Sequence, residues 1–282
     1  MMPRTLFLFV IICLVGCGKQ ETQPREASVP ERIISLAPDI TETVHALGLG
    51  DKLMGATTYC TYPDAAKTVP RVGGFGQFNF EAIVTLKPDL VILHEGYENE
   101  KSRLDGLGIR YLATKTRSVA DITESIRKVG MACGAEAEVE KRIGEINARI
   151  AGYRKTSGDA PRVLITFGGD ASSIDQIHAF GTECLHNELL EIAGGKNVVE
   201  GHLPFSTLSK EAAIRLNPDI IIQLAPGTEA PADPTKAWQG MAGINAVKNH
   251  RIHVLTGDHT CIPGPRFIQT LDDFAEIIRQ ND

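Results

Sequence analysis

The chain has 282 residues, of which 29 are Lys or Arg and 35 are Asp or Glu, so its formal net charge is −6. This acidic balance argues against a nucleic-acid partner, which would need a basic face to neutralise phosphates. Hydrophobic residues make up 43% of the chain and charged residues 23%, a composition typical of folded globular proteins and unlike that of disordered chains.

The first residues predict an export signal. Arg4 precedes an apolar run at 5–15, which is shorter than the roughly 20 residues that a membrane-spanning helix needs. A basic residue, a short apolar run and then small residues are typical of secreted proteins. The segment Leu-Val-Gly-Cys17 resembles a bacterial lipobox, so we expect residues 1–16 to be removed and Cys17 to carry the lipid. The alternative is an ordinary secretory signal with an incidental cysteine.

Residues 17–30 are polar and show no periodicity, which predicts a flexible tether. The mature protein is therefore expected to be exported and held to a bacterial cell membrane by its lipid, facing the periplasm or the cell exterior. Several acyl chains make such an anchor stable, whereas one alone binds marginally.

Four cysteines remain after the signal and the lipidation site, namely Cys60, Cys133, Cys184 and Cys261. An even number of cysteines in an oxidising compartment allows three pairings, among which spacing alone does not choose. Their spacings fit no zinc-binding pattern.

An internal repeat divides the folded part into two lobes. Residues 79–92 and 209–222 share one template: a polar cap residue, Glu two positions later, Ala, Leu five positions further on, then Pro-Asp and an aliphatic run. Glu81 and Glu211 are 130 positions apart, about half of the mature chain. The simplest explanation is two lobes built on the same plan, at 31–135 and 157–282.

Each lobe alternates short aliphatic runs with helical stretches. The runs are apolar throughout, which is typical of parallel strands covered on both faces. Strand and helix alternation indicates βαβ units, and hence an α/β fold with a parallel sheet flanked by helices in each lobe. The expected strands, in chain order, are 32–36, 53–57, 90–93, 110–113, 162–167, 197–199, 220–224 and 252–255. Among the expected helices are 42–47, 81–86, 185–192 and 267–279.

A long helix is expected between the lobes, at 136–156. The stretch is rich in Glu, Lys, Arg, Ala and Ile, with apolar residues near helical spacing, and turn-forming residues end it. One helix that joins two α/β lobes holds them in a nearly fixed relation, so we expect only a small closing motion.

Aromatic residues gather where the strands of the two lobes end. Ligands of open parallel sheets bind beyond the carboxyl ends of the strands. Six of the sixteen aromatic residues lie at these ends, beside glycines: Tyr59, Tyr62, Phe75, Tyr97, Phe167 and Phe205. Aromatic walls with a few polar groups suit a large, partly apolar small molecule. Taken singly, each of these residues is more often part of a core.

Several segments resemble the iron-chelate and vitamin B12 (Fe/B12) periplasmic-binding proteins, the solute receptors of ABC importers. They are Arg32-Ile-Ile-Ser-Leu-Ala-Pro38, Tyr59-Cys-Thr-Tyr-Pro63, Val72-Gly-Gly74, Leu86-Lys-Pro-Asp-Leu-Val91 and Pro263-Gly-Pro-Arg266. The resemblance runs from about residue 30 to the C-terminus. It implies two α/β lobes joined by one long helix, and a monomeric receptor that hands a cobalt or iron chelate to a membrane permease dimer with its ATPase.

In that family one exposed glutamate on each lobe docks onto arginines of the permease. The family positions fall on Glu81 and Glu211, the pair that the repeat already marks. The alternative role for each is that of a first-turn carboxylate that interacts favourably with its helix dipole, worth about 0.3–1 kcal/mol.

The resemblance also implies ligand-binding residues. Cobalamin-binding members carry aromatic residues at the positions of Tyr59, Phe75, Phe167 and Phe205, and a tryptophan where this chain has His94. The full expected set is Pro38, Tyr59, Phe75, His94, Phe167, Phe205, Asp258, His259 and Arg266. Cobalamin is the first choice of ligand, followed by a ferric siderophore or haem. Anionic siderophores usually require several cleft arginines, for which this chain offers Arg266 and Arg71.

The disulfide of the cobalamin-binding members falls on Ala193 and Ala275, so that bridge is absent here. Because Cys184 and Cys261 both lie on loops at the expected cleft mouth, we expect them to pair instead.

Other chemistry is less well supported. His94, Asp258 and His259 could converge on the metal of a chelate, but hydrogen bonding to ligand amides is the plainer role, and no resident metal or cofactor is expected. The chain has neither a Gly-x-Ser-x-Gly elbow nor a P-loop, so it is not expected to be an enzyme. An exported, lipid-anchored hydrolase with Cys60 as nucleophile is the alternative of another class.

Overall fold

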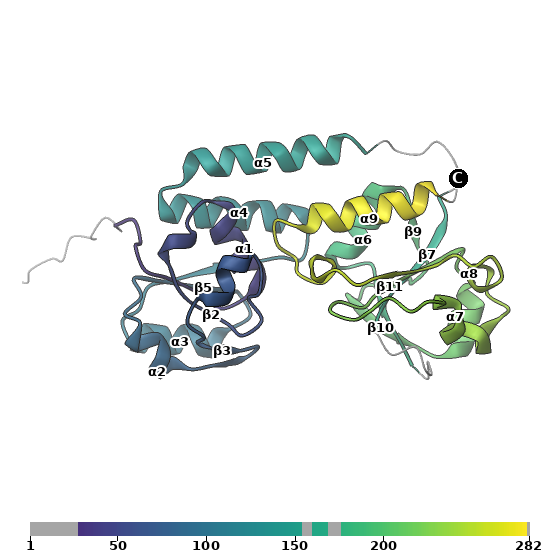
Figure 1. Cartoon of the computed structure of the whole chain (residues 1–282), viewed down its shortest axis with the longest axis horizontal. Helices are drawn as coiled ribbons and strands as arrows, with labels where there is room; N and C mark the ends of the chain where they lie inside the picture. Colours follow the sequence, from purple (N-terminus) through teal and green to yellow (C-terminus); the bar gives the residue numbers. More distant parts are fainter. Residues whose placement is uncertain (1–27, 154–159, 169–175, 281–282) are drawn as a thin grey trace, which may run out of the picture.

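The structure is a computed structural model, and it describes residues 28–153, 160–168 and 176–280. The expected signal peptide, Cys17 and most of the expected tether lie outside the described residues. Figure 1 shows two lobes side by side, with one helix, α5, running along the top from the first lobe toward the second. The expected fold class, two α/β lobes joined by a long helix, is confirmed.

The first lobe contains a four-stranded parallel sheet in the order β2-β1-β5-β6. Its strands are β1 (Ile33–Ser35), β2 (Leu53–Ala56), β5 (Leu90–His94) and β6 (Tyr111–Thr114). A small hairpin, β3 (Gly73–Gly74) and β4 (Gln77–Phe78), projects from the lobe. Its helices are α1 (Pro38–Ala46), α2 (Phe80–Thr85) and α3 (Glu98–Gly106). The aliphatic residues of β5 are fully buried, as expected for a strand covered on both faces.

The second lobe contains a sheet in the order β10-β8-β7-β11-β12, with β9 also paired to β7. Its strands are β7 (Arg162–Phe167), β8 (Ile177–Phe180), β9 (Lys196–Asn197), β10 (Phe205–Leu208), β11 (Ile220–Leu224) and β12 (Ile252–Leu255). Its helices are α6 (Leu185–Ala193), α7 (Lys210–Leu216), α8 (Asn245–Lys248) and α9 (Phe267–Arg279).

The expectation of a wholly parallel sheet is wrong in one part of the second lobe. Strand β8 runs antiparallel to β7, and β10 runs antiparallel to β8. These strands lie toward the sheet edge, and β10 alternates exposed with partly buried side chains. Continuous aliphatic runs mark strands that are buried on both faces, and partly exposed edge strands such as β8 and β10 do not contain them.

The repeat appears in the structure as the same interactions in both lobes. Asp89 accepts hydrogen bonds from the backbone N–H of Arg32 at 3.0 Å, and Asp219 accepts one from Arg162 at 3.1 Å. Strand β1 pairs with β5, and β7 with β11, in the same register. Asp219 follows Asp89 by 130 positions, and Arg162 follows Arg32 by the same number. The two lobes therefore share one construction down to individual backbone contacts.

Two antiparallel helices connect the lobes. The expected inter-lobe helix is α5 (Glu136–Ala151), which ends at Gly152; residues 154–156 of the expected range lie outside the described residues. Its neighbour, α4 (Val119–Cys133), was not predicted from the sequence, and it precedes a left-handed turn at Gly134. The helices approach closely, because a Cβ atom at Gly130 would lie 2.0 Å from the side chain of Val139.

A single hydrophobic cluster runs through both lobes and the connecting helices. It includes residues of β1 and β5 in the first lobe, of α4 and α5, and of β7, α6, β11 and α9 in the second. Because the lobes share this core, a wide separation of one lobe from the other would expose buried apolar surface. Within the described ranges no helix is both long and apolar enough to cross a membrane.

Candidate ligand-binding site

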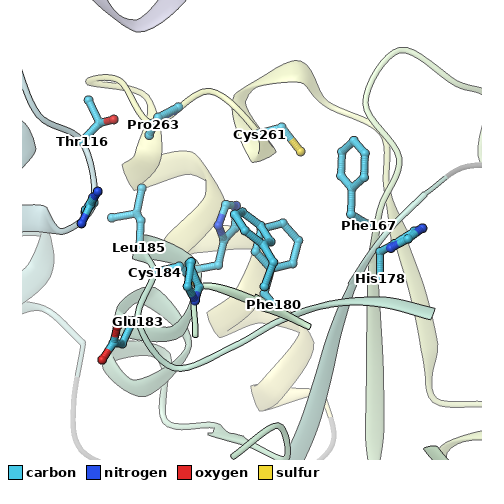
Figure 2. Close-up of a pocket in the computed structure, with 13 residues that line it drawn as sticks. Thr116, Phe167, His178, Phe180, Glu183, Cys184, Leu185, Cys261 and Pro263 are labelled. Atoms are coloured by element: carbon cyan, nitrogen blue, oxygen red, sulfur yellow. The ribbon is translucent and has the colours of Figure 1, made fainter. Parts of the chain in front are cut away.

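A cavity of about 710 Å³ lies where the segment between β6 and α4 passes the second lobe. Sites for small molecules typically measure 300–1,000 Å³. Figure 2 shows Thr116 of that segment on one side of the cavity and Phe167 and His178 of the second lobe on the other. The described lining residues are Thr116, Arg117, Phe167, His178, Phe180, Glu183, Cys184, Leu185, His186, Pro204, Phe205, Cys261 and Pro263.

Aromatic rings form one wall of this cavity. The ring centroids of Phe180 and Phe205 are 5.1 Å apart, and those of Phe180 and His186 are 4.2 Å apart. Phe205 is 60% exposed and Phe167, at the end of β7, is 49% exposed. Exposed apolar rings at the mouth of a cavity are available to stack on a flat ligand. The structure thus brings together Phe167 and Phe205 from the expected ligand-binding set.

Two further rings of this wall, Phe180 and His186, were not predicted from the sequence. Phe180 lies opposite Phe205 because β8 and β10 pair antiparallel, and that pairing leaves no aliphatic run to detect. The alternation of buried and exposed positions at Ile177, His178 and Ala179 is the one sequence signal that could have indicated β8. His186, on α6, also lines the cavity, and its ring Nε2 lies 2.6 Å from the Thr260 carbonyl oxygen.

The expected disulfide between Cys184 and Cys261 is not present, and both side chains are free thiols. Each lines the cavity, and each has its own hydrogen bond: the Cys184 thiol donates to the Gly181 carbonyl oxygen at 3.3 Å, and Cys261 accepts from the Thr260 hydroxyl at 3.8 Å. Two cysteines on the same rim do not by themselves meet the narrow geometry of a disulfide. Burial raises the pKa of both thiols, so they are protonated at neutral pH.

The aromatic residues expected on the first lobe lie apart from this wall. Tyr59 is 60% exposed and Phe75 is 83% exposed, and the Tyr59 ring lies against Gly74 of the β3–β4 hairpin. Neither residue, nor Pro38 at the start of α1, is among the described residues that line the cavity. In Figure 1 the hairpin and β10 lie on the side of the two lobes away from α5. A role of these residues in ligand binding stays a prediction.

His94 forms a partly buried polar group with Asp39 and Thr114 at the carboxyl end of β5. Its ring Nε2 lies 3.1 Å from an Asp39 carboxylate oxygen, and its Nδ1 lies 3.3 Å from the Thr114 hydroxyl. Burial alone would lower the pKa of His94, but the hydrogen bond and the charge of Asp39 outweigh it, so the pKa is raised above its ordinary value. Its ring therefore does not stand free as a ligand contact.

Replacing Asp39 with Asn is expected to lower the pKa of His94 below its ordinary value, since burial remains and the carboxylate charge is gone. A histidine whose pKa is higher in the folded than in the unfolded state stabilises the folded protein. This stabilisation is complete at pH values below the pKa of the unfolded state, and it is lost as the pH rises through the pKa of the folded state. The deficit of D39N in free energy of unfolding should thus be largest near pH 5 and shrink toward pH 8. NMR titration of the His94 ring and urea unfolding across this range measure both effects. An equal deficit at every pH would contradict the pairing.

Arg266 and Asp258 were expected in the ligand site, but the structure places them in an ion-pair cluster between the lobes. The Arg266 guanidinium contacts Asp258 at 2.7 Å and Glu42, on α1 of the first lobe, at 2.5 Å. It also lies 3.7 Å above the Tyr62 ring. The hydrogen bond from Arg266 lowers the pKa of Asp258, whereas burial raises that of Glu42. We call Arg266, Glu42 and Asp258 the inter-lobe clasp.

His259 was also expected in the ligand site, but its side chain contacts α9 instead. Its ring Nε2 lies 2.8 Å from a carboxylate oxygen of Asp273 on α9, and it is not among the described lining residues. Short loops after a strand can direct successive side chains to opposite sides, which residue order alone does not reveal. Within the described ranges no three His, Cys, Asp or Glu side chains are arranged to hold a metal ion.

Glu81 and Glu211 occupy the same place in the two lobes. Each is exposed in the first turn of its helix, α2 or α7, after a capping residue, Asn79 or Ser209, whose side chain accepts a backbone hydrogen bond. Hydrogen bonding from Ser209 lowers the pKa of Glu211. Figure 1 shows α2 and α7 in different lobes, both below α5 and α9 in the view. Two carboxylates are thus presented to solvent at equivalent positions.

Comparison with known proteins agrees with this architecture. The family described as periplasmic binding protein matches residues 33–258. The chain is 30% identical to the uncharacterized ABC transporter substrate-binding lipoprotein YvrC of Bacillus subtilis (strain 168), over 96% of this chain and 94% of that protein.

Two solved structures are similar across most of the fold. The periplasmic vitamin B12 binding protein BtuF of Vibrio cholerae has a TM-score of 0.72 and 26% identity, covering 89% of this chain and 98% of that chain. The periplasmic heme-binding protein RhuT of Roseiflexus sp. RS-1 has the same TM-score, identity and coverage. The match over 33–258 and the relative at 30% identity identify this chain as a member of the periplasmic binding protein family, and a substrate-binding protein of the ABC transporter type.

Proposed function

We propose that this protein captures a metal–organic macrocycle outside the cell membrane and delivers it to an ABC permease dimer with its ATPase. Cobalamin is the first candidate, because the chain is similar to BtuF, which is described as a vitamin B12 binding protein. Haem is the second candidate, because RhuT, which is described as heme-binding, is equally similar. A ferric siderophore remains the alternative within the same family.

The observation that carries this proposal is the cavity of about 710 Å³ with its aromatic wall. Phe167 and Phe205 expose ring faces there, and Phe180 supports Phe205 from behind. A corrin or porphyrin ring offers a broad flat surface that such rings can cover. Neighbouring His186, whose pKa is lowered by burial, is a neutral imidazole; its Nε2–H donates to the Thr260 carbonyl oxygen, which leaves Nδ1 as a hydrogen-bond acceptor.

We infer that the site binds its ligand without converting it. The two thiols in the cavity have raised pKa values, which leaves little thiolate to act as a nucleophile. The family consists of solute receptors, which need only bind a ligand and release it to their transporter. Cys60, the nucleophile of the alternative hydrolase, is fully buried, and its thiol forms a hydrogen bond with the Thr57 hydroxyl.

Membrane attachment is proposed through the lipid on Cys17, in keeping with the description of YvrC as a lipoprotein. The lipid would keep the receptor near the membrane surface, where the permease lies. We further propose that the receptor acts as a monomer that presents Glu81 and Glu211 to the permease.

Direct binding measurements test the proposed function. Absorbance titration and calorimetry with cobalamin, cobinamide, haem and a ferric siderophore should show one-to-one binding of at least one of these. F167A and F205A should each weaken that binding by roughly 5- to 30-fold, because each loses about 1–2 kcal/mol of apolar contact. M131A, at an exposed apolar residue of α4, is the matched control and should bind like the wild type. Binding of none of the four chelates would refute the proposal.

A further inference from the structure

The cavity contains one permanently charged cation among its described lining residues, Arg117. This residue lies between the end of β6 and the start of α4, where the chain passes from the first lobe toward the second. The surrounding wall is largely aromatic and aliphatic, so a charge placed against it is screened less than a charge in open water.

The backbone is held on both sides of Arg117. The backbone N–H of Lys115 donates to the Ser125 hydroxyl at 3.0 Å, and that hydroxyl donates to the Lys115 carbonyl oxygen at 2.7 Å. The backbone N–H of Val119 donates to a carboxylate oxygen of Glu188, on α6 of the second lobe, at 2.8 Å. The segment that carries Arg117 is thus fixed between the two lobes.

The side chain of Arg117, in contrast, is exposed and has no hydrogen bond or ion pair with the described part of the chain. The arginines that were expected to serve a ligand anion are both occupied. Arg266 belongs to the inter-lobe clasp, and Arg71 donates to the carbonyl oxygens of Thr57 and Cys60. Arg117 is therefore the guanidinium that remains available at this cavity.

We infer that Arg117 pairs with an oxyanion on the periphery of the bound macrocycle, an inference that rests on the proposed function. A guanidinium presents donors in a planar fork that matches the two oxygens of a carboxylate or phosphate. The ligand class is then amphipathic: a flat apolar body against Phe167 and Phe205, and an anionic group at the inter-lobe segment. Glu183, which also lines the cavity, lies 3.4 Å from the His202 ring and does not neutralise Arg117.

Two sources could supply this oxyanion, namely the phosphodiester of the cobalamin nucleotide loop and the propionate carboxylates of haem. Two matched ligand pairs separate them. Cobinamide lacks the nucleotide loop with its phosphodiester, and haem dimethyl ester lacks the free carboxylates. Calorimetry or absorbance titration of the full mature chain with these four compounds is the experiment, performed on the wild type, R117Q, R117K and R127Q. Arg127 is an exposed α4 arginine paired with Glu124, away from the cavity, and R127Q is the control.

The expected result is that R117Q weakens binding of the anionic member of one pair by tenfold or more, and changes binding of its uncharged counterpart by less than twofold. R117K should keep part of the affinity, and R127Q all of it. An equal loss for both members of the bound pair, or no loss for either, would overturn the inference while leaving the receptor role intact. If the wild type binds none of these four compounds but binds the ferric siderophore, the inference fails and the receptor role stands. If the ferric siderophore does not bind either, the proposed function fails instead.

Discussion

Replacement of Arg266 by Met is expected to lower the free energy of unfolding by about 3–5 kcal/mol, because it leaves a buried carboxylate without its partner. The side chain of Arg266 is 11% exposed and that of Glu42 is 2% exposed. The second Glu42 oxygen already has no hydrogen-bond partner in the described structure. Loss of the guanidinium would therefore leave the whole carboxylate buried without a partner, beside the negative charges of Asp258 and Asp39.

The deficit of R266M should grow with pH. In the wild type, burial raises the pKa of Glu42 and Arg266 lowers it, and the effect of burial is the larger. Without Arg266 the pKa rises further, so the folded state binds more protons than the unfolded state and stability falls as pH increases. Below the unfolded pKa of the carboxyl group the folded variant keeps Glu42 neutral at no cost, and the deficit there reflects lost packing alone.

Urea unfolding of the wild type, R266M and the double variant E42L/R266M between pH 4 and pH 8 measures this effect. The double variant replaces both charges by apolar groups and should recover most of the stability, as buried ion pairs elsewhere do. D258N is the matched control, since Asp258 is 45% exposed and its loss should cost about 1 kcal/mol or less. A deficit in R266M no larger than in D258N would contradict a structural role for the clasp.

Charge reversal at both proposed docking positions, E81K/E211K, is expected to abolish transport while ligand affinity stays within twofold of the wild type. Each lysine would face permease arginines in place of a complementary carboxylate, and like charges at an interface cost several kcal/mol. Neither glutamate lines the cavity, and both are exposed, so the fold and the ligand site should be unaffected. The single reversals should each give a partial loss, because the repeat presents two equivalent contacts.

Uptake of labelled ligand by cells and calorimetry on the purified variants provide the two readouts. E140K, at an exposed position of α5 on the other side of the molecule, carries the same charge change and should transport normally. If E81K/E211K loses ligand affinity, the residues belong to the ligand site. If transport persists in the double variant, the two carboxylates have no docking role and act only on their helix dipoles.

Much of the fold can be predicted from the sequence because its signals are local. The aliphatic runs that became β5 and β11 are buried on both faces, so apolar residues dominate them, with His94 and Gln223 as the polar exceptions. Helix α9 spans Phe267–Arg279, the range that its pattern predicts. The repeat with its spacing of 130 residues also fixed the equivalence of the two lobes, down to the aspartates that hold β1 and β7.

The edge strands and the ligand wall could be predicted only in part. Strands β8 and β10 carry polar and exposed side chains, and their pairing joins segments separated by helix α6 and strand β9. The position of Phe180 behind Phe205 follows from that pairing. Residue type identified Phe167 and Phe205 as candidates, but no sequence pattern indicated which further side chains would surround them.

The roles of charged residues are the hardest to predict from the sequence. Arg266, Asp258 and Arg117 are all charged residues in segments that follow strands near the cavity, and their order in the chain does not show which of them contacts a ligand. Only the tertiary structure decides that Arg266 is neutralised by Glu42, more than 200 residues away, whereas Arg117 has no such partner. The sequence by itself determines the lobes, the repeat and the exposed glutamates, since these depend on local periodicity and helix capping. Which charges are paired depends on contacts between lobes, and these exist only once the chain has folded.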